Sequence, residues 1–600
     1  MKKIAPILTI IIALIAFPAG CKTGPKAKKR VGVTQIYPAD YTSNTGNTDK
    51  LGVAFSGGGT RSMMASMGQM RALRDLGLLN NDSIGLISSV SGGSWAAASY
   101  VYRKEQYMNE EFLSTGVEDP ARLVWDGAYA SPNNLGHISE NCMGIIPTRT
   151  YIEDLIESAV RLKKEYGYYW SEMWARIVGE RIFAQFDLNP IDRKGRPDCY
   201  IGDQPAWVIS NVSGIPMDEF QIIHDETAPP LIINGALFSD LENREYQLLP
   251  FEINGIKTGL PATVIENDFT FGGGFANAYS FASTDPRNAT QETVEADMQK
   301  TSLADATGIS SAFFATALAD QLRASLKQND WQRKLAEKDV ISSPLIEWLA
   351  DHKEDWLKEL EKETTFIPIY PYWSVAGVRN GNMEDRNVYF ADGGNLENTG
   401  VATLVSKGYD RILSFINTQT ALTMESSEGA EKLSVVDNLA ALFGYTPMLQ
   451  LDDDETKKYY RFSELNDQQF NQLSKTTKPY YDNQIFATED FEALLNGLYQ
   501  ANADENGLGA KAAVFTQTLT TVENEKFNVQ GGKTVQVTWF YLTPASDWNE
   551  QLKAHVRQKL EDRYSNFPNY RTIEDIGMEH QQINLLAHFT YWMVMNSGLK

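Results

Sequence analysis

Two short apolar runs near the start of the chain are each followed by small residues and then by a helical pattern. Leu51–Phe55 and Ile84–Val90 are predicted to be buried strands, because each run is short, apolar and bounded by turn residues. Between them, apolar residues recur at helical spacing over Arg61–Leu76, and Gly77 is placed as a helix stop. A second helix is predicted to open at Trp95. This alternation predicts an α/β fold with a mostly parallel central sheet flanked by helices.

Further strands and a long helical segment are predicted downstream. Ala206–Val212 is predicted to be a buried strand, and Val388–Ala391 a strand that ends at Asp392. Tyr409–Ile416 is predicted to be another strand. Residues 288–365 hold many helix formers and few glycines, which predicts helices there.

One of these helices carries a stripe of aromatic and apolar residues. Ser343 followed by Pro344 is a helix-start signal. The stripe after it consists of Leu345, Trp348, Leu349, His352, Trp356 and Leu360. Such a face is most often part of the core, and contact with lipid is the alternative interpretation.

Composition and charge narrow the classes of partner. The chain has 600 residues, 42% of them hydrophobic and 22% charged, as in an ordinary globular protein with a large core. The formal net charge of −23 would repel the phosphate backbone of a nucleic acid, so no nucleic-acid partner is expected. A membrane partner is compatible with this charge, since a local basic or apolar face can still dock. Residues 420–510 are acidic and are predicted to form an insertion on the surface.

The N-terminus has the features of a targeting segment. Residues 1–20 are predicted to be a signal peptide, because the apolar core Ile4–Phe17 is too short to span a bilayer comfortably. Ala19–Cys21 resembles the bacterial lipoprotein processing site, at which the cysteine is acylated, although Pro18 departs from the usual aliphatic residue. We favour a lipid-anchored Cys21 over an ordinary secretory signal with an incidental cysteine. The protein is therefore expected to be an exported lipoprotein of the outer membrane or periplasm.

Residues 21–50 are predicted to be a flexible tether between this anchor and the folded protein. The segment is polar, and its first part is basic: Lys22, Lys26, Lys28, Lys29 and Arg30. These charges could strengthen binding to an anionic membrane surface. A merely solvated linker is an equally good interpretation.

The remaining cysteines and the histidines give no pattern for a metal. Cys142 and Cys199 could pair in an oxidising compartment or remain buried thiols, and both interpretations stay open. The six histidines are scattered, without a His-Glu-x-x-His motif. The acidic run Asp452–Glu455 lacks the spaced ligands and glycine of a calcium loop. No metal and no cofactor is expected, and the sequence gives no indication of the oligomeric state.

A glycine run and a serine at the end of a strand carry the candidate chemistry. Ser91, within Ser89–Gly93, fits a small-x-Ser-x-Gly turn that places a hydroxyl at a sharp bend between strand and helix. Gly57–Gly59 match neither a dinucleotide fingerprint nor a nucleotide P-loop, because the final glycine of the first and the Gly-Lys-Ser/Thr of the second are missing. Their backbone N–H groups are therefore interpreted as donors for an oxyanion.

A serine hydroxyl needs a base within hydrogen-bonding reach. Asp392 comes at the end of a predicted strand, and Gly393 and Gly394 after it leave room around the carboxylate. An aspartate serves as a base when desolvation raises its pKa. An ordinary Asp-Gly turn is the alternative when these residues are taken by themselves.

Taken together, these motifs resemble the catalytic domain of the cytosolic phospholipase A and lysophospholipase (phospholipase B) family, within the patatin-like superfamily. The resemblance rests on Ser56–Arg61 (SGGGTR), Val90–Trp95 (VSGGSW) and Ala391–Gly394 (ADGG). Weaker similarities are found at Pro250–Glu252, Phe271–Gly274 and Gly308–Phe313. The three motifs in this order are fairly specific for this family, whereas each motif by itself is not.

This resemblance implies a fold and a set of roles. The family fold is a helix-flanked, mostly parallel sheet with a helical cap inserted between serine and aspartate, for which residues 288–365 are the candidate. Residues 51–600 would form the catalytic domain. Ser91 would be the nucleophile and Asp392 the base, without a histidine, and the N–H groups of Gly58 and Gly59 would hold the oxyanion.

The resemblance also implies a substrate. Arg61 matches the family arginine that contacts substrate phosphate. Lys407 falls roughly where family members have a second basic residue, although a lysine there is a departure. The implied activity is hydrolysis of fatty-acyl esters of phospholipids or lysophospholipids at a membrane.

Two other functions remain open at this point. A Ser-His-Asp esterase would use Ser91, Asp392 and one of His555, His580 or His588, although none of these histidines lies in a recognisable turn after a strand. A non-enzymatic surface lipoprotein that binds lipid or glycan is the second alternative. The presence of both Ser91 and Asp392 in matching motifs favours the enzyme.

Overall fold

The computed structural model describes residues 30–39, 48–239, 247–266, 269–330, 332, 341–362, 364–427, 430–447, 459–474, 477–505, 507–572 and 576–599. The strands are β1 (Arg30–Tyr37), β2 (Leu51–Phe55), β3 (Ile84–Val90), β4 (Tyr200–Ile201), β5 (Phe220–Gln221), β6 (Leu231–Phe238), β7 (Leu248–Ile253), β8 (Lys257–Glu266), β9 (Phe269–Asn277), β10 (Thr284–Arg287), β11 (Thr293–Met298), β12 (Ile369–Tyr372), β13 (Arg386–Asp392), β14 (Arg411–Ile416), β15 (Thr423–Ser427), β16 (Ala430–Ser434), β17 (Tyr445–Pro447), β18 (Tyr459–Arg461), β19 (Ala513–Thr520) and β20 (Thr534–Tyr541). The helices are α1 (Gly59–Asp75), α2 (Gly92–Val101), α3 (Glu110–Leu113), α4 (Ile152–Tyr166), α5 (Met173–Val178), α6 (Pro205–Asn211), α7 (Leu303–Ser310), α8 (Phe313–Leu326), α10 (Ser343–Leu360), α11 (Val375–Arg379), α12 (Val401–Ser406), α13 (Asp437–Ala441), α14 (Asp467–Gln472), α15 (Asp490–Asn502), α16 (Ser546–Gln551), α17 (Ala554–Arg563) and α18 (His580–Met595).

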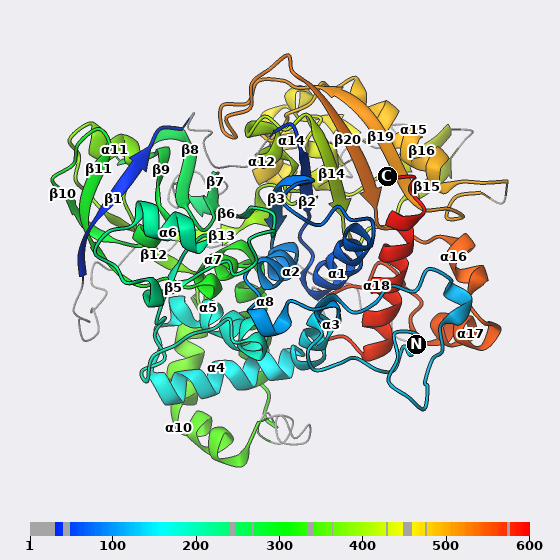
Figure 1. The fold of residues 1–600 in the computed structure, drawn as a ribbon, viewed down its shortest axis with the longest axis horizontal. Coiled ribbons are helices and arrows are strands. Elements are labelled where there is room, and N and C mark those ends of the chain that lie inside the picture. Colours follow the sequence, from blue (N-terminus) through cyan, green and yellow to red (C-terminus); the bar gives the residue numbers. More distant parts are fainter. Residues whose placement is uncertain are drawn as a thin grey trace.

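Most of the strands form one large sheet, which confirms the predicted α/β fold (Figure 1). Its order is β10-β11-β1-β9-β8-β7-β6-β3-β2-β14-β20-β19, and β12 and β13 pair off this path. The centre, from β6 through β3, β2 and β14 to β20, is parallel. The strands that extend this centre on both sides, and β13, pair in antiparallel fashion.

Helices cover both faces of the parallel centre of the sheet. Alternate residues of a strand point to opposite faces, and here the residues on both faces are apolar and buried. Val53 and Phe55 of β2 join an apolar cluster with α1, α2 and α18. Ala54, between them, joins a second cluster with α12, α13 and α15. Helix α1 is buried over nearly its whole length, since α18 packs on the side away from the sheet. Figure 1 shows α1, α2 and α18 together over the central strands, with α4 and α10 at the lower edge of the view.

Two strands approach each other end to end along one edge of β6. The last residue of β3, Val90, lies opposite Asn234 of β6. The last residue of β13, Asp392, lies opposite the next residue, Gly235, on the same edge, because β7 occupies the other edge. Strand β3 runs parallel to β6 and β13 runs antiparallel to it, so their carboxyl ends meet. The residue that follows Val90 is therefore placed beside Asp392.

The segment predicted to be a flexible tether is partly a strand. Residues 30–37 form β1, which pairs with β11 over six positions and with β9 over two. Thr34 and Ile36 point into the core, while Val31 and Val33 are exposed, and this alternation is the pattern of a half-buried strand. The prediction is therefore wrong for residues 30–37. Residues 1–29, which include Cys21, and residues 40–47 lie outside the described residues.

The predicted strand at Ala206–Val212 is wrong, since residues 206–211 belong to helix α6 (Pro205–Asn211) and Val212 follows its end. Pro205 occupies the first turn of that helix, where its missing N–H costs nothing. Only Val208 of the helix is buried, and Ile209 is 73% exposed. The apolar run is thus part of a short surface helix that buries a single side chain.

The helical segment predicted over residues 288–365 begins with a strand. Strand β11 occupies Thr293–Met298, and the helices that follow are α7, α8 and α10. The aromatic stripe of α10 is mostly core: Trp356 is 1% exposed, and its ring meets Trp170 edge-on at 4.7 Å. Among the described residues, no helix is long and apolar enough to cross a membrane.

The acidic segment 420–510 contributes to the core as well as to the surface. Phe443, Phe491 and Leu494 are buried in the cluster that covers β14 and β20. The hydroxyl of Tyr480 donates a hydrogen bond to the carbonyl of Gly394, directly after β13, at 3.0 Å. The segment therefore packs against the turn that follows Asp392. The acidic run Asp452–Glu455 lies outside the described residues.

Candidate active site

Ser91 occupies a strained turn between β3 and α2. Its φ of 50° and ψ of −119° are unusual for a residue with a side chain. The turn is tightly packed, because a Cβ on Gly92 would overlap the backbone of Gly59. A Cβ on Gly93 would lie 2.6 Å from the carbonyl oxygen of Phe55. Small residues after the serine are therefore required for α2 to lie against the end of β2.

The hydroxyl of Ser91 is directed at the carboxylate of Asp392. Ser91 Oγ donates to Asp392 Oδ2 at 3.1 Å, across 301 positions of sequence. The two residues are 4% and 2% exposed. The geometry is that of a nucleophile within hydrogen-bonding reach of a base.

Burial changes the acidity of Asp392. Loss of solvent raises the pKa of this carboxyl from 3.8 to about 7. Hydrogen bonds from the N–H of Gly394 to Oδ1 (2.7 Å) and from the N–H of Phe313 to Oδ2 (3.2 Å) act against this rise, as does the bond from Ser91. A pKa near neutrality lets the carboxylate accept a proton from Ser91 and give it back.

The triple-glycine loop lies directly beside Ser91. A Cβ on Gly57 would be 3.0 Å from Cβ of Ser91, and the N–H of Gly57 donates to the carbonyl of Asn398 at 3.0 Å. In the described part of the chain, the N–H groups of Gly58 and Gly59 have no acceptor. These two groups lie at the N-terminus of α1, where the helix dipole favours negative charge. They are available as donors for an oxyanion.

Arg61 is a buried cation on the other side of this loop. Its Nε donates to Asn417 O at 3.0 Å and its Nη1 to Tyr570 O at 2.5 Å. A Cβ on Gly58 would overlap Nη2. Burial lowers the pKa of the guanidinium to about 9, and no carboxylate among the described residues pairs with it. Arg61 is thus a cation beside the oxyanion loop.

Lys407 is not brought to this site. Its Nζ lies 2.8 Å and 2.9 Å from the two carboxylate oxygens of Glu252, and both residues are buried. Glu252 is opposite Asn234 on β6, whereas Asp392 is opposite the adjacent Gly235. Adjacent positions point to opposite faces of a sheet, so Lys407 and Asp392 lie on different faces. The expectation that Lys407 contacts substrate finds no support in its placement.

No histidine among the described residues hydrogen bonds to Ser91 or Asp392. His588 is buried on α18, where its Nε2 lies 3.0 Å from Pro132 O. Burial and the nearby Arg71 charge lower the pKa of His588 to about 3. His555 is exposed on α17, and His580 is half-buried at the start of α18.

Sequence reasoning gave no role to the junction between α7 and α8, although it noted Gly308–Phe313 as a weak similarity. In the structure, Ser310 Oγ accepts the N–H of Ser91 at 2.9 Å. The N–H of Phe313 donates to Asp392, as described above, and the ring of Phe314 packs on Gly59. One short segment therefore contacts Ser91, Asp392 and the triple-glycine loop. In the sequence, the weak similarity at Gly308–Phe313 was the signal that pointed to this segment.

A small apolar pocket adjoins the triple-glycine loop. It lies between α4 and α8 and is lined by Ile152, Leu155, Phe314, Ala317, Leu318, Gln321 and Ile576. Phe314 connects the pocket to the loop, since its ring would meet a Cβ on Gly59 at 2.6 Å. The carbonyl of Ile576 accepts the hydroxyl of Thr60 at 2.5 Å, which ties the opposite wall to the start of α1.

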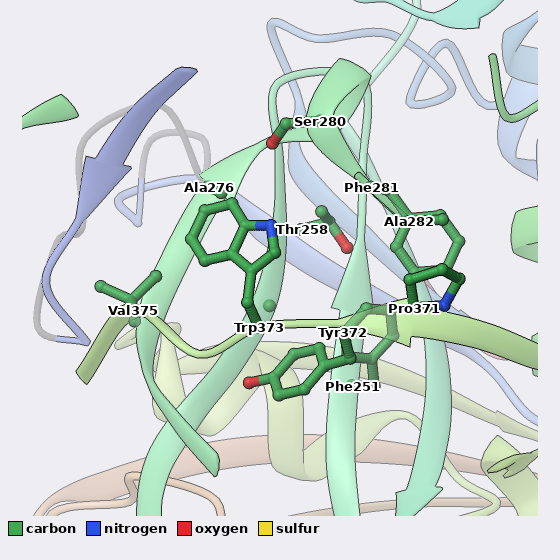
Figure 2. A pocket seen from close by; sticks show the side chains of 12 residues that line it. Phe251, Thr258, Ala276, Ser280, Phe281, Ala282, Pro371, Tyr372, Trp373 and Val375 are labelled. Carbon is green, nitrogen blue, oxygen red and sulfur yellow. The ribbon is translucent and has the colours of Figure 1, made fainter. Parts of the chain in front are cut away.

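A second cavity lies farther along the antiparallel part of the sheet (Figure 2). Phe251, Phe281, Tyr372 and Trp373 supply most of its aromatic wall, and the hydroxyl of Thr258 has no partner among the described residues. None of its lining residues belongs to the Ser91–Asp392 pair or to the triple-glycine loop. This cavity is therefore not part of the candidate site.

The described residues offer no cluster of three or more His, Cys, Asp or Glu that could hold a metal ion. Cys142 and Cys199 are both buried and are not joined to each other. Burial raises the pKa of both thiols.

Comparison with known proteins gave similarity to solved structures only. No protein-family model and no curated protein matches the chain. The chain is similar to human GIVD cytosolic phospholipase A2, with a TM-score of 0.45 and 11% identity over 91% of this chain and 58% of that one. It is also similar to the same human enzyme in complex with methyl gamma-linolenyl fluorophosphonate and terbium chloride, with a TM-score of 0.39, 12% identity, and coverage of 91% and 57%.

Proposed function

We propose that this protein is a serine acyl hydrolase that cleaves fatty-acyl esters of phospholipids or lysophospholipids. The proposal is carried by one observation: Ser91 Oγ lies 3.1 Å from the buried carboxylate of Asp392, at a strained turn beside two N–H groups that have no acceptor among the described residues. This is the geometry that serine-dependent acyl transfer needs, with a nucleophile, a base and preset donors for the oxyanion.

In the first half of the reaction, Ser91 becomes acylated. Its Oγ attacks the ester carbonyl carbon while its proton passes to Asp392 Oδ2. The carbonyl oxygen becomes an oxyanion that accepts the N–H groups of Gly58 and Gly59. When the tetrahedral intermediate collapses, the bond to the alcohol oxygen breaks, and this oxygen takes the proton from Asp392. The alcohol, here the deacylated lipid, leaves.

In the second half, water releases the fatty acid. Asp392 takes a proton from the water, whose oxygen attacks the acyl carbon held by the same two N–H groups. Collapse of this second intermediate breaks the bond between carbon and Ser91 Oγ, and Oγ recovers the proton from Asp392. The free carboxylic acid is the second product, and the enzyme returns to its initial state.

Two features of the site favour a lipid ester as substrate. The pocket between α4 and α8 offers aliphatic and aromatic side chains to an acyl chain whose carbonyl lies at Gly58 and Gly59. The guanidinium of Arg61 has no carboxylate partner among the described residues, and a phosphodiester headgroup is an anion that suits it. We propose that Arg61 attracts the headgroup phosphate and that Lys407, held by Glu252, does not.

We also propose that the enzyme is exported and held at a membrane through acylation of Cys21. The basic residues after Cys21 and the lipid substrate both suit this location. Metabolic labelling with a fatty acid tests it: the label is expected on the wild type and should be absent from Cys21→Ser. Equal labelling of the two proteins would contradict the anchor.

The test of the activity is product analysis with matched variants. Purified protein is incubated with vesicles of phosphatidylcholine and lysophosphatidylcholine, and released fatty acid is measured by mass spectrometry. Ser91→Ala is expected to lose release and also covalent labelling by a fluorophosphonate probe. Ser210→Ala, an exposed serine on α6, serves as the control and is expected to keep both. Unchanged fatty-acid release by Ser91→Ala would overturn the proposal. Loss of release in His555→Ala, His580→Ala or His588→Ala, with stability retained, would indicate a Ser-His-Asp mechanism instead of the two-residue mechanism.

A further inference from the structure

We infer that Ser310, the last residue of α7, is a positioning residue that holds the backbone of Ser91 in the conformation that directs its hydroxyl at Asp392. The inference rests on the proposed function of Ser91. It assigns Ser310 no contact with substrate. Ser310 is fully buried, and it approaches Ser91 from a helix more than two hundred positions away in sequence.

The hydroxyl of Ser310 uses its whole hydrogen-bonding capacity. A serine hydroxyl has one donor and two acceptor positions. Ser310 Oγ donates to Asn234 O at 2.6 Å, accepts the N–H of Ser91 at 2.9 Å and lies 3.0 Å from Ser94 Oγ. Since the only proton of Ser310 goes to Asn234, the hydroxyl of Ser94 donates in the third contact. A hydroxyl with three partners is fixed in orientation.

These partners surround the strained turn. Asn234 lies opposite Val90 on β6, and Ser94 is in the first turn of α2, so Ser310 ties together the strand before Ser91 and the helix after it. Among the described residues, Ser310 supplies the only acceptor for the N–H of Ser91. A residue with a side chain adopts positive φ at a cost, and it stays there only when its surroundings hold it.

The role of Ser310 is separate from that of the base. Among the described residues, Ser310 makes no hydrogen bond to the carboxylate of Asp392, whose backbone donors are Phe313 and Gly394. Loss of the Ser310 hydroxyl should therefore slow the attack by Ser91 without moving the pH at which Asp392 becomes ionised. This separates a positioning role from an effect on the base.

Ser311 provides a matched control. It is the next residue, is equally buried, and its hydroxyl accepts the indole N–H groups of Trp95 and Trp174 at 3.2 Å and donates to Thr307 O at 2.6 Å. In the described part of the chain, its hydroxyl forms no hydrogen bond with Ser91 or Asp392. Removing this hydroxyl costs a comparable amount of buried hydrogen bonding and leaves the nucleophile's own contacts in place.

The experiment measures phosphonylation of Ser91 by a fluorophosphonate probe in the full-length protein. Two values are taken: the second-order rate constant and the final number of probe molecules per chain. Ser310→Ala is expected to react about tenfold more slowly, reach the same stoichiometry as wild type and keep the same pH midpoint. Ser311→Ala should react within about twofold of wild type. Ser310→Cys keeps the shape of the side chain but accepts hydrogen bonds poorly, so its rate constant should lie between those of wild type and Ser310→Ala. This variant replaces Ser310→Ala in the experiment if the alanine variant does not fold.

Three results would overturn the inference. A wild-type rate in Ser310→Ala, or in Ser310→Cys where only that variant folds, would show that the hydroxyl does not position Ser91. A wild-type rate with reduced stoichiometry would show a purely structural role, and an equal slowing in Ser311→Ala would show that general loss of packing is the cause. Failure of the proposed function looks different, because the wild type itself would then neither react with the probe nor release fatty acid.

Discussion

Ser91 and Asp392 lie at the facing ends of two strands that share one edge of β6. Strand β3 stops opposite Asn234 and β13 stops opposite Gly235, so the residues at their carboxyl ends are brought within 3.1 Å of each other. The register of a hydrogen-bonded strand therefore sets the distance between the side chains of Ser91 and Asp392. A loop would set it less rigidly.

Replacing the base should abolish activity and preserve the fold. In Asp392→Asn the side chain keeps its size but cannot accept the proton of Ser91, so kcat is expected to fall by about 10²- to 10⁴-fold. Fatty-acid release per active chain is the measurement, with thermal unfolding as the check on folding. Asp351→Asn, at an exposed position of α10, is the control and should keep wild-type activity. Activity within a few-fold of wild type in Asp392→Asn would exclude this carboxylate as the base.

Activity should rise with pH through neutrality. Only the ionised carboxylate of Asp392 accepts the proton of Ser91, and burial places its pKa at about 7. The pH profile of kcat/KM should therefore show an ascending limb with a midpoint near 7. A profile that stays flat from pH 5 to pH 8 would contradict this assignment.

The same carboxyl should make the free energy of unfolding fall as the pH rises, whereas activity rises with pH. Its pKa is about 7 in the folded protein and 3.8 when solvated, so the folded state binds a proton that the unfolded state has lost. The stabilisation is complete below about pH 4 and is lost as the pH rises through 7, with a change of roughly 4 kcal/mol at most.

Urea unfolding of wild type and Asp392→Asn at pH 5 and pH 8 measures this linkage. Because the variant lacks the titrating group, its free energy of unfolding relative to wild type should be greater at pH 8 than at pH 5. A relative stability that is the same at both pH values would show that Asp392 titrates alike in the folded and unfolded states.

A methyl group in the oxyanion loop should block catalysis. Gly58 has a φ of 141°, and a Cβ there would overlap the guanidinium of Arg61 and lie 2.9 Å from Asn417 O. Gly58→Ala is therefore expected to displace the N–H donors and lower kcat by about 10²-fold or more. Gly77→Ala is the control, since Gly77 also has a positive φ, of 73°, but a Cβ added there would meet no other atom within 4 Å. It should lose about 1 kcal/mol of stability and no activity. Equal activity of the two variants would rule out the proposed loop.

Filling the pocket between α4 and α8 should change the preference for chain length. Leu318→Trp places a bulky indole ring where the acyl chain is proposed to lie. The value of kcat/KM for a palmitoyl ester is expected to fall by about tenfold or more, while that for a butyryl ester stays within about twofold. Ile209→Trp, at an exposed position of α6, is the control. An equal effect on both esters would place the acyl chain elsewhere.

Local patterns predicted the elements around the site well. The strands at Leu51–Phe55 and Ile84–Val90 have the bounds that the sequence predicted, and Gly77 follows the end of α1. A short apolar run between turn residues has few alternatives in a buried sheet. The same reasoning failed at Ala206–Val212, where an equally apolar run begins with Pro205 and lies on the surface as a helix. Burial, which the run itself does not specify, separates the two cases.

The strand β1 was missed for a related reason. Its basic and polar neighbours suggested a solvated linker, while Thr34 and Ile36 alternate with exposed residues in the pattern of a strand. A short alternating run becomes a strand only when an edge is available to pair with it, and here β11 supplies that edge. That edge comes from residues some 260 positions downstream.

The amino-acid sequence determined which groups could carry the chemistry. A serine at a tight turn after an apolar run, a row of glycines and an aspartate at the end of a strand are local patterns, because backbone geometry at a turn depends on the residues within it. Only the tertiary structure decided which of these groups meet. In the folded protein, Ser91 hydrogen bonds to Asp392 and to Ser310, whereas Lys407 forms an ion pair with Glu252 away from this site. Contacts between residues far apart in the chain depend on strand order and register, which no local pattern specifies.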